Sequence, residues 1–188
     1  SLKNYGLKIC YCKNLRSYNK IIHTLKKYKD CFIITFDDDI IYGNKSVEYL
    51  INGQKKNPGK IIANRVHKII LNEKKIPEKY NKWIWNSNCK TRNKLNFQTG
   101  VYGVLYPPYS FFKDVSKEKI FKKISPSADD LWLYWMIRLN KKFVVWSGYR
   151  KKNFDNFNLD ETLINENIKH HGNDEQIKKL IRYYGFPK

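Results

Sequence analysis

The sequence predicts a single α/β domain over residues 1–188, with a largely parallel central sheet flanked by helices. One observation is size and composition: 188 residues, 41% hydrophobic and 15% aromatic, are enough to bury a sizeable core. The other is that short apolar runs alternate with stretches of helical period in the first half of the chain. Strands that alternate with helices are joined by crossovers, which bring neighbouring strands parallel.

The first half of the chain predicts the element order β-α-β-α-β. Residues Leu7–Cys12 and Cys31–Phe36 are short apolar runs, and each is expected to be a strand. Between them, Leu15–Lys29 places apolar residues on one helical face and lysines on the other. A short helix over Ser46–Lys56, with its first serine as the N-cap, leads to a predicted strand over Ile61–Ile70.

The second half is less regular. Residues Tyr80–Lys94 have no clear period and predict a long loop. Residues Gln98–Tyr106 alternate as a strand does, although two glycines interrupt them. The remaining predicted elements are a helix over Ala128–Asn140 capped by Ser127, a strand over Phe143–Trp146, a polar loop or tail over Arg150–His171, and a last helix from Asn173 to Gly185 with Gln176 in a capping-box position.

Charge and cysteine usage narrow the function classes. The net charge of +20 should attract polyanions, but only six of the basic residues are arginines, on which sequence-reading nucleic-acid binders depend. We therefore expect no specific nucleic-acid partner. The four cysteines have no zinc-ligand spacing, and no apolar stretch approaches the length of a membrane span. These features predict a cytoplasmic protein.

Three consecutive aspartates, Asp37, Asp38 and Asp39, follow the predicted strand Cys31–Phe36 directly. Neighbouring carboxylates repel one another, and a divalent cation would relieve the repulsion because Mg²⁺ and Mn²⁺ favour hard oxygen ligands. Open α/β sheets also bind ligands at the carboxyl ends of their strands. The triplet therefore predicts a metal site. The alternative is a solvated acidic turn.

Four blocks, in order along the chain, resemble one family. They are Ile33–Tyr42, Ile61–His67, Thr99–Pro108 and Ser127–Leu133. Together they resemble bacterial glycosyltransferases of the GT-A fold, the kind that builds lipopolysaccharide or capsule. The resemblance runs from about Leu7 to the last predicted helix. GT-A enzymes begin with an earlier strand and helix that are missing from this sequence. The resemblance therefore implies either a fragment of a GT-A fold or a protein that departs from the family at its N-terminal end.

The resemblance implies a donor site around the aspartates. Asp39 would ligate Mn²⁺ or Mg²⁺, Asp37 would contact the ribose or the metal's water shell, and Asp38 would lie between them. The cation would act as a Lewis acid on the diphosphate leaving group of a nucleotide-sugar. Lys20 would add positive charge at the phosphates and Tyr18 would pack near the base. Alternatively, Lys20 is one more solvated lysine.

A second candidate site is Asp129-Asp130, at the start of a predicted helix. Inverting GT-A enzymes often use an acid of a Glu-Asp-x-x-Leu pattern as the base that takes the acceptor proton. Residues 129–133 resemble that pattern, with Asp in place of Glu, which implies Asp130 as the base and Asp129 as its support or as a residue that positions the acceptor. The alternative is structural, because the helix dipole favours acids in a first turn.

Two glycines and an arginine complete the candidate donor and acceptor contacts. Gly100 and Gly103 lie within a predicted strand, where glycine marks a bulge or a close approach, and the family places this block beside the donor sugar and acceptor. Arg65 and His67 are two apart on a predicted strand and share a face. Either could meet a phosphate or the acceptor, or form a structural ion pair.

Two further pairs are open to more than one interpretation. Trp83 and Trp85 are candidates for stacking on an acceptor sugar, or for a place in the core or a flap. Some GT-A enzymes use a C-terminal histidine as an additional metal ligand, which implies His171 for that role and leaves His170 on the surface.

The predicted function is transfer of a hexose from a nucleotide-sugar to a saccharide or lipid-linked saccharide acceptor in surface polysaccharide synthesis, with inversion. UDP is the expected nucleotide because it prevails in the family. The basic surface would contact the anionic inner face of the membrane. One alternative is a nucleotidyl or phosphoryl transferase that acts on nucleic acid, which would need a third acid beside Asp37 and Asp39. The other is a non-catalytic remnant that binds no nucleotide.

Overall fold

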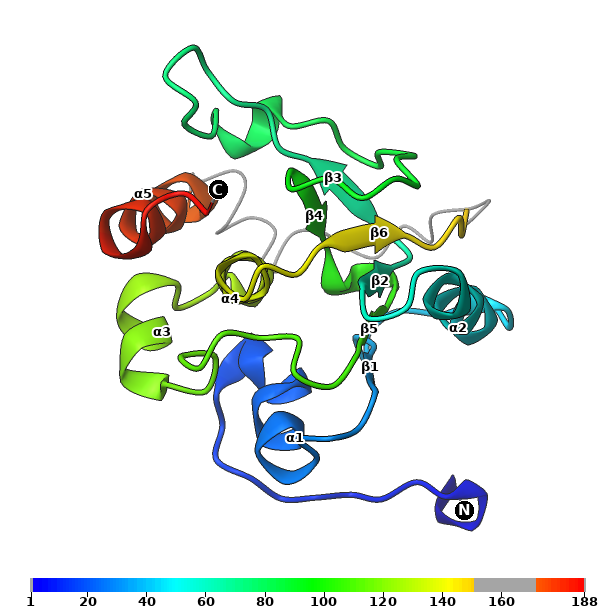
Figure 1. Ribbon diagram of the computed structural model, residues 1–188. Helices are drawn as coiled ribbons and strands as arrows, with labels where there is room; N and C mark the ends of the chain where they lie inside the picture. Colours follow the sequence, from blue (N-terminus) through cyan, green and yellow to red (C-terminus); the bar gives the residue numbers. More distant parts are fainter. Residues whose placement is uncertain (1, 151–171, 188) are drawn as a thin grey trace.

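The computed structural model describes residues 2–150 and 172–187, which form an α/β fold with helices on both sides of a mixed sheet (Figure 1). In the described part, this sheet has four strands in the order β1-β5-β2-β6. These strands are β1 (Ile33–Thr35), β5 (Val104–Tyr106), β2 (Ile61–Ala63) and β6 (Val144–Trp146). The α/β class is therefore confirmed.

The prediction of a largely parallel sheet is wrong. Strand β5 runs antiparallel to both of its neighbours, β1 and β2, and only β2 and β6 are parallel. Strands β1 and β2 do run in the same direction, as a β-α-β order requires, but β5 lies between them. Because β5 comes from far along the chain, local alternation of strands and helices gives no sign of it.

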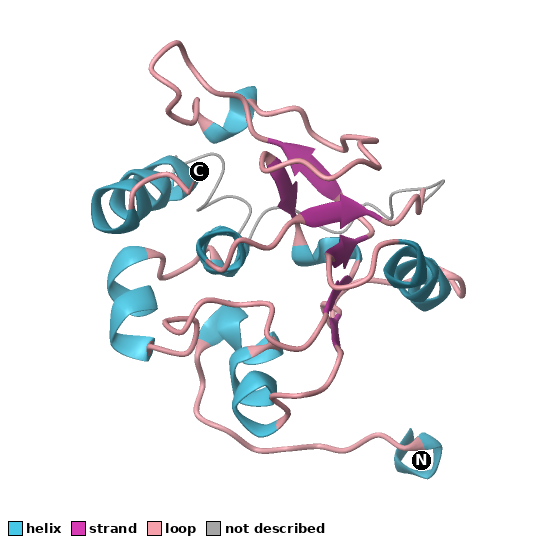
Figure 2. Cartoon of the chain, viewed as in Figure 1, coloured by secondary structure: helices cyan, strands magenta, loops and turns pink. Residues whose placement is uncertain are grey.

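Two of the predicted strands each correspond to two shorter strands, one in the main sheet and one in a second, two-stranded sheet. Residues Ile61–Ile70 become β2 and then β3 (Val66–Lys68), while Gln98–Tyr106 is replaced by β4 (Asn96–Gln98), a 3-10 turn η4 (Gly100–Tyr102) and β5. Strands β3 and β4 pair antiparallel. In Figure 2 a loop connects β2 to β3, whereas a helical turn lies between β4 and β5.

Gly103 allows the chain to turn between η4 and β5, where the predicted strand Gln98–Tyr106 is interrupted. Its φ is +94°, and a Cβ atom there would lie 2.4 Å from Cε1 of Phe36. Any other residue would meet both a backbone strain and a steric clash. Gly103 therefore serves the packing of η4 and β5 against the end of β1.

The two faces of the main sheet are covered unequally. Helix α2 (Ser46–Lys56) covers one face, where Leu50 packs with residues of β2, β5 and β6. The opposite face carries the larger core, at whose centre lies α4 (Asp129–Leu139). Further helices on this side are α1 (Ile22–Lys27), α3 (Glu118–Ile124) and α5 (Gly172–Tyr184).

The N-terminal predictions are partly wrong. Residues Leu7–Cys12 form no strand and are exposed; Tyr11 is 99% exposed. The chain begins instead with a 3-10 turn, η1 (Leu2–Tyr5). The predicted helix over Leu15–Lys29 consists of the 3-10 turn η2 (Arg16–Lys20) followed by α1. Its predicted apolar face is buried from Leu15 to Ile22, whereas Tyr28 at its end is exposed. The apolar pattern thus identified the core residues without fixing the type of helix.

Helices α2 and α4 lie where the sequence predicts them, but their predicted serine caps are wrong. Ser46 is the first residue of α2 and its hydroxyl donates to the carbonyl of Gly43 at 2.6 Å. Ala128, not Ser127, is the N-cap of α4. Gly185, with φ +73°, ends α5 as predicted. Within the described residues, no helix is long and apolar enough to cross a membrane.

Candidate active site

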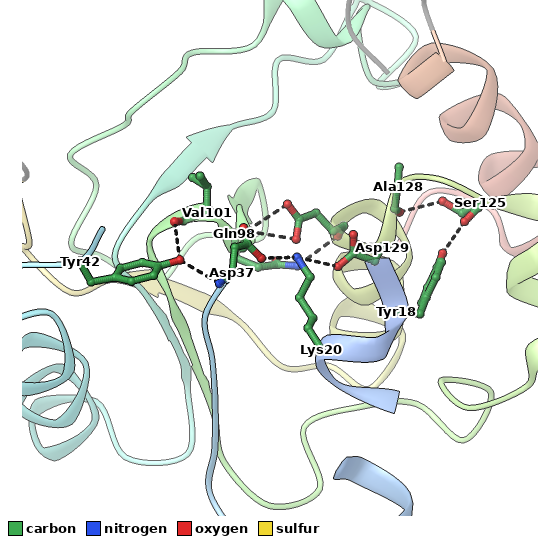
Figure 3. Close-up of polar contacts among 11 residues, drawn as sticks. Tyr18, Lys20, Asp37, Tyr42, Gln98, Val101, Ser125, Ala128 and Asp129 are labelled. Carbon is green, nitrogen blue, oxygen red and sulfur yellow. Dashed lines mark hydrogen bonds and ion pairs between the residues drawn. The ribbon is translucent and has the colours of Figure 1, made fainter. Parts of the chain in front are cut away.

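The aspartate triplet lies in a turn at the carboxyl end of β1, as predicted. The backbone N–H of Asp37 donates to Oη of Tyr42 at 2.8 Å, and this hydroxyl donates to the carbonyl of Val101 at 3.1 Å (Figure 3). These bonds connect the start of the turn to η4. Asp38 and Asp39 follow in the turn and are exposed.

Lys20 bridges this turn to the start of α4. Its Nζ lies 2.7 Å from Oδ1 of Asp37 and 3.3 Å from Oδ2 of Asp129 (Figure 3). Its side chain is 20% exposed, so Lys20 is not one of the solvated lysines of the surface. Burial alone would lower its pKa, but the nearby carboxylates raise the pKa above its usual range and keep the ammonium charged.

The carboxylate of Asp130 faces the backbone of η4. Its two oxygens accept from the N–H of Gly100 at 3.1 and 3.0 Å, and its own carbonyl accepts from Nε2 of Gln98 at 3.1 Å. Asp129 beside it is buried, with 6% of its surface exposed. The acids of the first turn of α4 thus point into the molecule rather than into solvent.

Burial gives these two acids unusual proton affinities. Loss of solvent, together with the negative charge of Asp129, raises the pKa of Asp130 to about 7, although Lys20 opposes the shift. Burial likewise raises the pKa of Asp129, again against the effect of Lys20. A carboxylate whose pKa lies near neutrality is suited to accept a proton in a reaction.

Gly100 marks the point where the separate segments meet. A Cβ atom at this position would lie 3.0 Å from Nζ of Lys20, 3.2 Å from Oδ1 of Asp130 and 3.8 Å from Oδ1 of Asp37. Lys20 and Asp37 of the predicted donor site and Asp130 of the second candidate site therefore meet at Gly100. A side chain at Gly100 would crowd them.

The start of α4 is held by Gln176, a residue of α5. Oε1 of Gln176 accepts from the backbone N–H groups of Ser127 and Ala128, at 3.2 and 3.1 Å, and from Oγ of Ser125 at 3.1 Å. The sequence places Gln176 in a capping-box position, and its Nε2 does donate to the carbonyl of Gly172 in the first turn of α5, at 3.1 Å. Its other contacts fix the segment from which Asp129 and Asp130 project.

Tyr18 lies in the core. It is 1% exposed, its ring stacks on Phe121 with centroids 4.1 Å apart, and its hydroxyl donates to the carbonyl of Ser125 (Figure 3). Tyr18 therefore anchors η2, the turn that carries Lys20, to the same segment that Gln176 holds. It also lines a surface pocket of about 430 Å³ together with Arg16 and Lys122.

Arg65 lies outside the contacts of Lys20. Its Nε donates to Oδ1 of Asn86 at 2.8 Å, and its guanidinium lies 5.7 Å from the ring centroid of Tyr102. His67 is buried and stacks on Trp85. Burial and the charge of Arg65 lower the pKa of His67 to about 3, so this imidazole is neutral and structural.

The tryptophans differ in position, and the histidine pair cannot be placed. Trp83 is a core residue that packs on Phe97, whereas Trp85 is 39% exposed. His170 and His171, the latter a predicted metal ligand, lie outside the described residues.

The carboxylates at the end of β1 fit a divalent cation only if the substrate supplies further ligands. Within residues 2–150 and 172–187, no group of three His, Cys, Asp or Glu side chains is arranged to hold a metal ion. Asp37 is paired with Lys20, while Asp39 is exposed and accessible. Mg²⁺ is commonly held by one or two carboxylates together with substrate phosphates, and Asp37 and Asp39 are the candidates for that role in this turn.

Three residues of the site were not predicted to belong to it: Tyr42, Gln98 and Gln176. Tyr42 and Gln98 are polar residues next to apolar strand sequences, and nothing else in the sequence indicates that they belong to the site.

No family model matches the chain, and no curated protein or solved structure is detectably similar to it. The site must therefore be interpreted from its own geometry.

Proposed function

We propose that this chain is a glycosyltransferase domain of the GT-A type, which transfers a hexose from a nucleotide-sugar to a saccharide acceptor. The observation that carries the proposal is the convergence on Gly100 of the acidic turn after β1, the ammonium of Lys20 and the carboxylate of Asp130. An anion-binding group, candidate metal ligands and a proton acceptor then lie around one point. The mixed α/β sheet is compatible with this proposal.

The donor would bind at the end of β1. Asp39 and Asp37 would hold Mn²⁺ or Mg²⁺, and the bound cation would supply Lewis-acid stabilisation of the diphosphate leaving group. Lys20 supplies a protein cation at the same place, because its Nζ lies 2.7 Å from Asp37. This ion pair would hold the ammonium in position before the donor binds. On binding, the ammonium would move from the carboxylate to a phosphate oxygen. Asp38 would contact the nucleotide-sugar from the same turn.

Asp130 would act as the base. With a pKa of about 7 it is substantially ionised at neutral pH, yet it holds a proton far better than an exposed aspartate does. The N–H of Gly100 fixes its orientation through both oxygens. Such a base supports inversion, because it takes the proton of the acceptor hydroxyl as that hydroxyl attacks the anomeric carbon. Asp129 would keep the pKa of Asp130 high through its charge.

The wider context of the proposal follows from charge. The net charge of +20 favours a cytoplasmic enzyme that touches the anionic inner face of the membrane and there meets a lipid-linked acceptor. UDP is the proposed nucleotide.

The test is the melting temperature with UDP, GDP and CDP, each with and without Mn²⁺. Ligands that bind only the folded state raise this temperature. A rise with one nucleotide that requires Mn²⁺, persists in Asp114→Asn and is lost in Asp39→Ala is the expected result. Asp114 is a suitable control because it is a buried carboxylate paired with Lys117. No rise with any nucleotide would contradict the proposal and leave a non-catalytic remnant.

One observation favours a second candidate, metal-dependent nucleotidyl or phosphoryl transfer on nucleic acid. That chemistry needs a third acid near Asp37, and Asp129 meets this need because both carboxylates contact the same ammonium. This candidate predicts binding of single-stranded RNA or DNA that weakens steeply with salt and is lost in Asp37→Asn. Binding that only salt affects, and not the substitution, would reflect the basic surface alone.

A further inference from the structure

A pocket of about 290 Å³ opens where the parallel strands β2 and β6 end. Residues that line it come from both strand ends, from η4 and from the loop before β4. The lining side chains used in the argument below are Arg65, Asn86, Tyr102, Trp146, Tyr149 and Arg150. The carboxyl ends of parallel strands are the usual place for ligands in α/β sheets.

The aromatic side chains of the pocket are held in place. Nε1 of Trp146 donates to the carbonyls of Asn64 and Tyr149, at 3.1 and 3.2 Å. Tyr149 packs edge-on against Tyr49, with ring centroids 5.5 Å apart. Ordered aromatic faces beside asparagine amides suit a ligand that has both an apolar ring face and hydroxyl groups, which is the chemistry of a saccharide.

The charge of the pocket is positive. Arg65 and Arg150 line it, and no described residue that lines it carries a carboxylate. Lys90 adds to this charge, because its Nζ lies 5.8 Å from the ring centroid of Trp146, and Arg150 lies 5.7 Å from the same centroid. A guanidinium binds carboxylate and phosphate groups through paired hydrogen bonds, so the pocket favours an anionic ligand.

The pocket and the candidate active site share one segment. Turn η4 places Gly100 against Asp130 and places Tyr102 in the wall of the pocket. The N–H of Thr99 donates to the carbonyl of Arg65 at 3.2 Å, which connects the arginine to the same turn. A ligand in the pocket would therefore contact the turn whose first residue binds the proposed base.

We infer that this pocket is an acceptor subsite for a saccharide that carries a carboxylate or a phosphate group. Arg65 and Arg150 bind the anionic group, and the ring of the sugar lies against the aromatic side chains. The acceptor role depends on the proposed transferase function; the binding of an acidic saccharide does not.

The test is titration, by calorimetry and by ligand-observed NMR, with methyl glucuronide, glucose 6-phosphate, methyl glucoside and inorganic phosphate. At least one acidic sugar should bind saturably and more tightly than the neutral glucoside. The preference between the carboxylate and the phosphate sugar identifies the anionic group. Arg150→Gln should weaken binding by about tenfold, since it removes a charge-assisted contact, and Arg65→Gln should do the same. Arg182→Gln, at an exposed position of α5, should change nothing.

Three results would overturn the inference. Equal binding of the neutral and acidic sugars would remove the role of the arginines. Inorganic phosphate that binds as tightly as glucose 6-phosphate would reveal a simple anion site. Unchanged binding in both Arg150→Gln and Arg65→Gln would place the ligand elsewhere on the basic surface.

The nucleotide melting test separates this inference from the proposed function. A chain that binds the acidic sugar but no nucleotide has the pocket without the transferase. A chain that binds the nucleotide but no acidic sugar has the donor site without this acceptor subsite. Asp39→Ala should affect only the nucleotide, and Arg150→Gln only the sugar.

Discussion

The two acidic segments of the candidate site contain the same residue type in opposite surroundings. Asp38 and Asp39 lie exposed in the turn after β1, whereas Asp129 is 6% exposed in the first turn of α4. Lys20 contacts both segments, through Asp37 and Asp129. Identical side chains thus acquire different chemistry from their environment, because solvent stabilises a charge that burial penalises.

This contrast assigns different tasks to the two segments. Exposed carboxylates can exchange a partner such as a cation without a large desolvation cost, which suits a binding role. Burial, together with the negative charge of Asp129, raises the pKa of Asp130 to about 7, which suits proton transfer. Substitutions in the two segments should therefore have different effects on turnover, stability and nucleotide binding.

The largest expected effect is on turnover in Asp130→Asn. Loss of a general base should lower the rate of hexose transfer by roughly 10²- to 10⁴-fold, since an amide cannot take the acceptor proton. The rate is measured as release of nucleoside diphosphate from the donor that the melting screen identifies. The nucleotide-induced rise in melting temperature should remain. Asp114→Asn should keep the full rate, and an unaffected rate in Asp130→Asn would remove the proposed base.

Lys20→Met should cause the largest loss of stability. Without the ammonium, Asp37 and Asp129 are left without their shared counter-ion, and the free energy of unfolding should fall by about 2–3 kcal/mol at pH 8. Urea denaturation measures it. The loss should be smaller at pH 5, where Asp130, whose pKa burial and the charge of Asp129 raise to about 7, is protonated and the negative charge beside Lys20 is lower. Lys26→Met, at an exposed position of α1, should be nearly neutral; an equal loss there would show that the ion pairs contribute nothing.

The pH dependence of the wild type should run in opposite directions for rate and stability. The pKa of Asp130 is raised from roughly 4 in the unfolded chain to about 7 in the folded one. Between these values the folded state holds a proton that the unfolded state has released, so stability falls as pH rises through this window, by about 1.4 kcal/mol per pH unit and roughly 3–4 kcal/mol in all. The transfer rate should rise over the upper part of it.

Asp130→Asn separates the contribution of this group from that of all others. The substitution should flatten both profiles, because the amide does not titrate in this range. Urea denaturation at pH 5 and pH 8 gives the stability, and kcat/KM over the same range gives the rate. A stability slope that survives the substitution would assign the titration to another residue.

The smallest effect on stability is expected for Asp39→Ala, in the exposed turn. The free energy of unfolding should change by less than about 0.5 kcal/mol, as for other surface substitutions. The Mn²⁺-dependent rise with nucleotide should nevertheless disappear. Asp38→Ala should keep part of that rise. If Asp39→Ala keeps all of it, the metal ligand lies elsewhere.

Local sequence patterns predicted much of the fold and of the candidate site. The ranges of α2 and α4 and the position of β1 follow from apolar periodicity, and periodicity is a property of neighbours in the chain. Lys20, Asp37, Gly100 and Asp130 do lie together, as the resemblance implied. The predicted strand over Leu7–Cys12 was wrong. This segment is apolar enough for a strand, but it pairs with no other strand of the described chain.

Most apolar core positions, and the acidic residues after β1 and at the start of α4, can be read from the sequence alone. Tertiary structure alone placed β5 between β1 and β2, because pairing over a long sequence separation depends on the whole chain. It also decided that Gln176 holds the start of α4 and that Tyr18 belongs to the core. The pKa of Asp130 is likewise tertiary, since desolvation depends on every segment that surrounds the carboxylate.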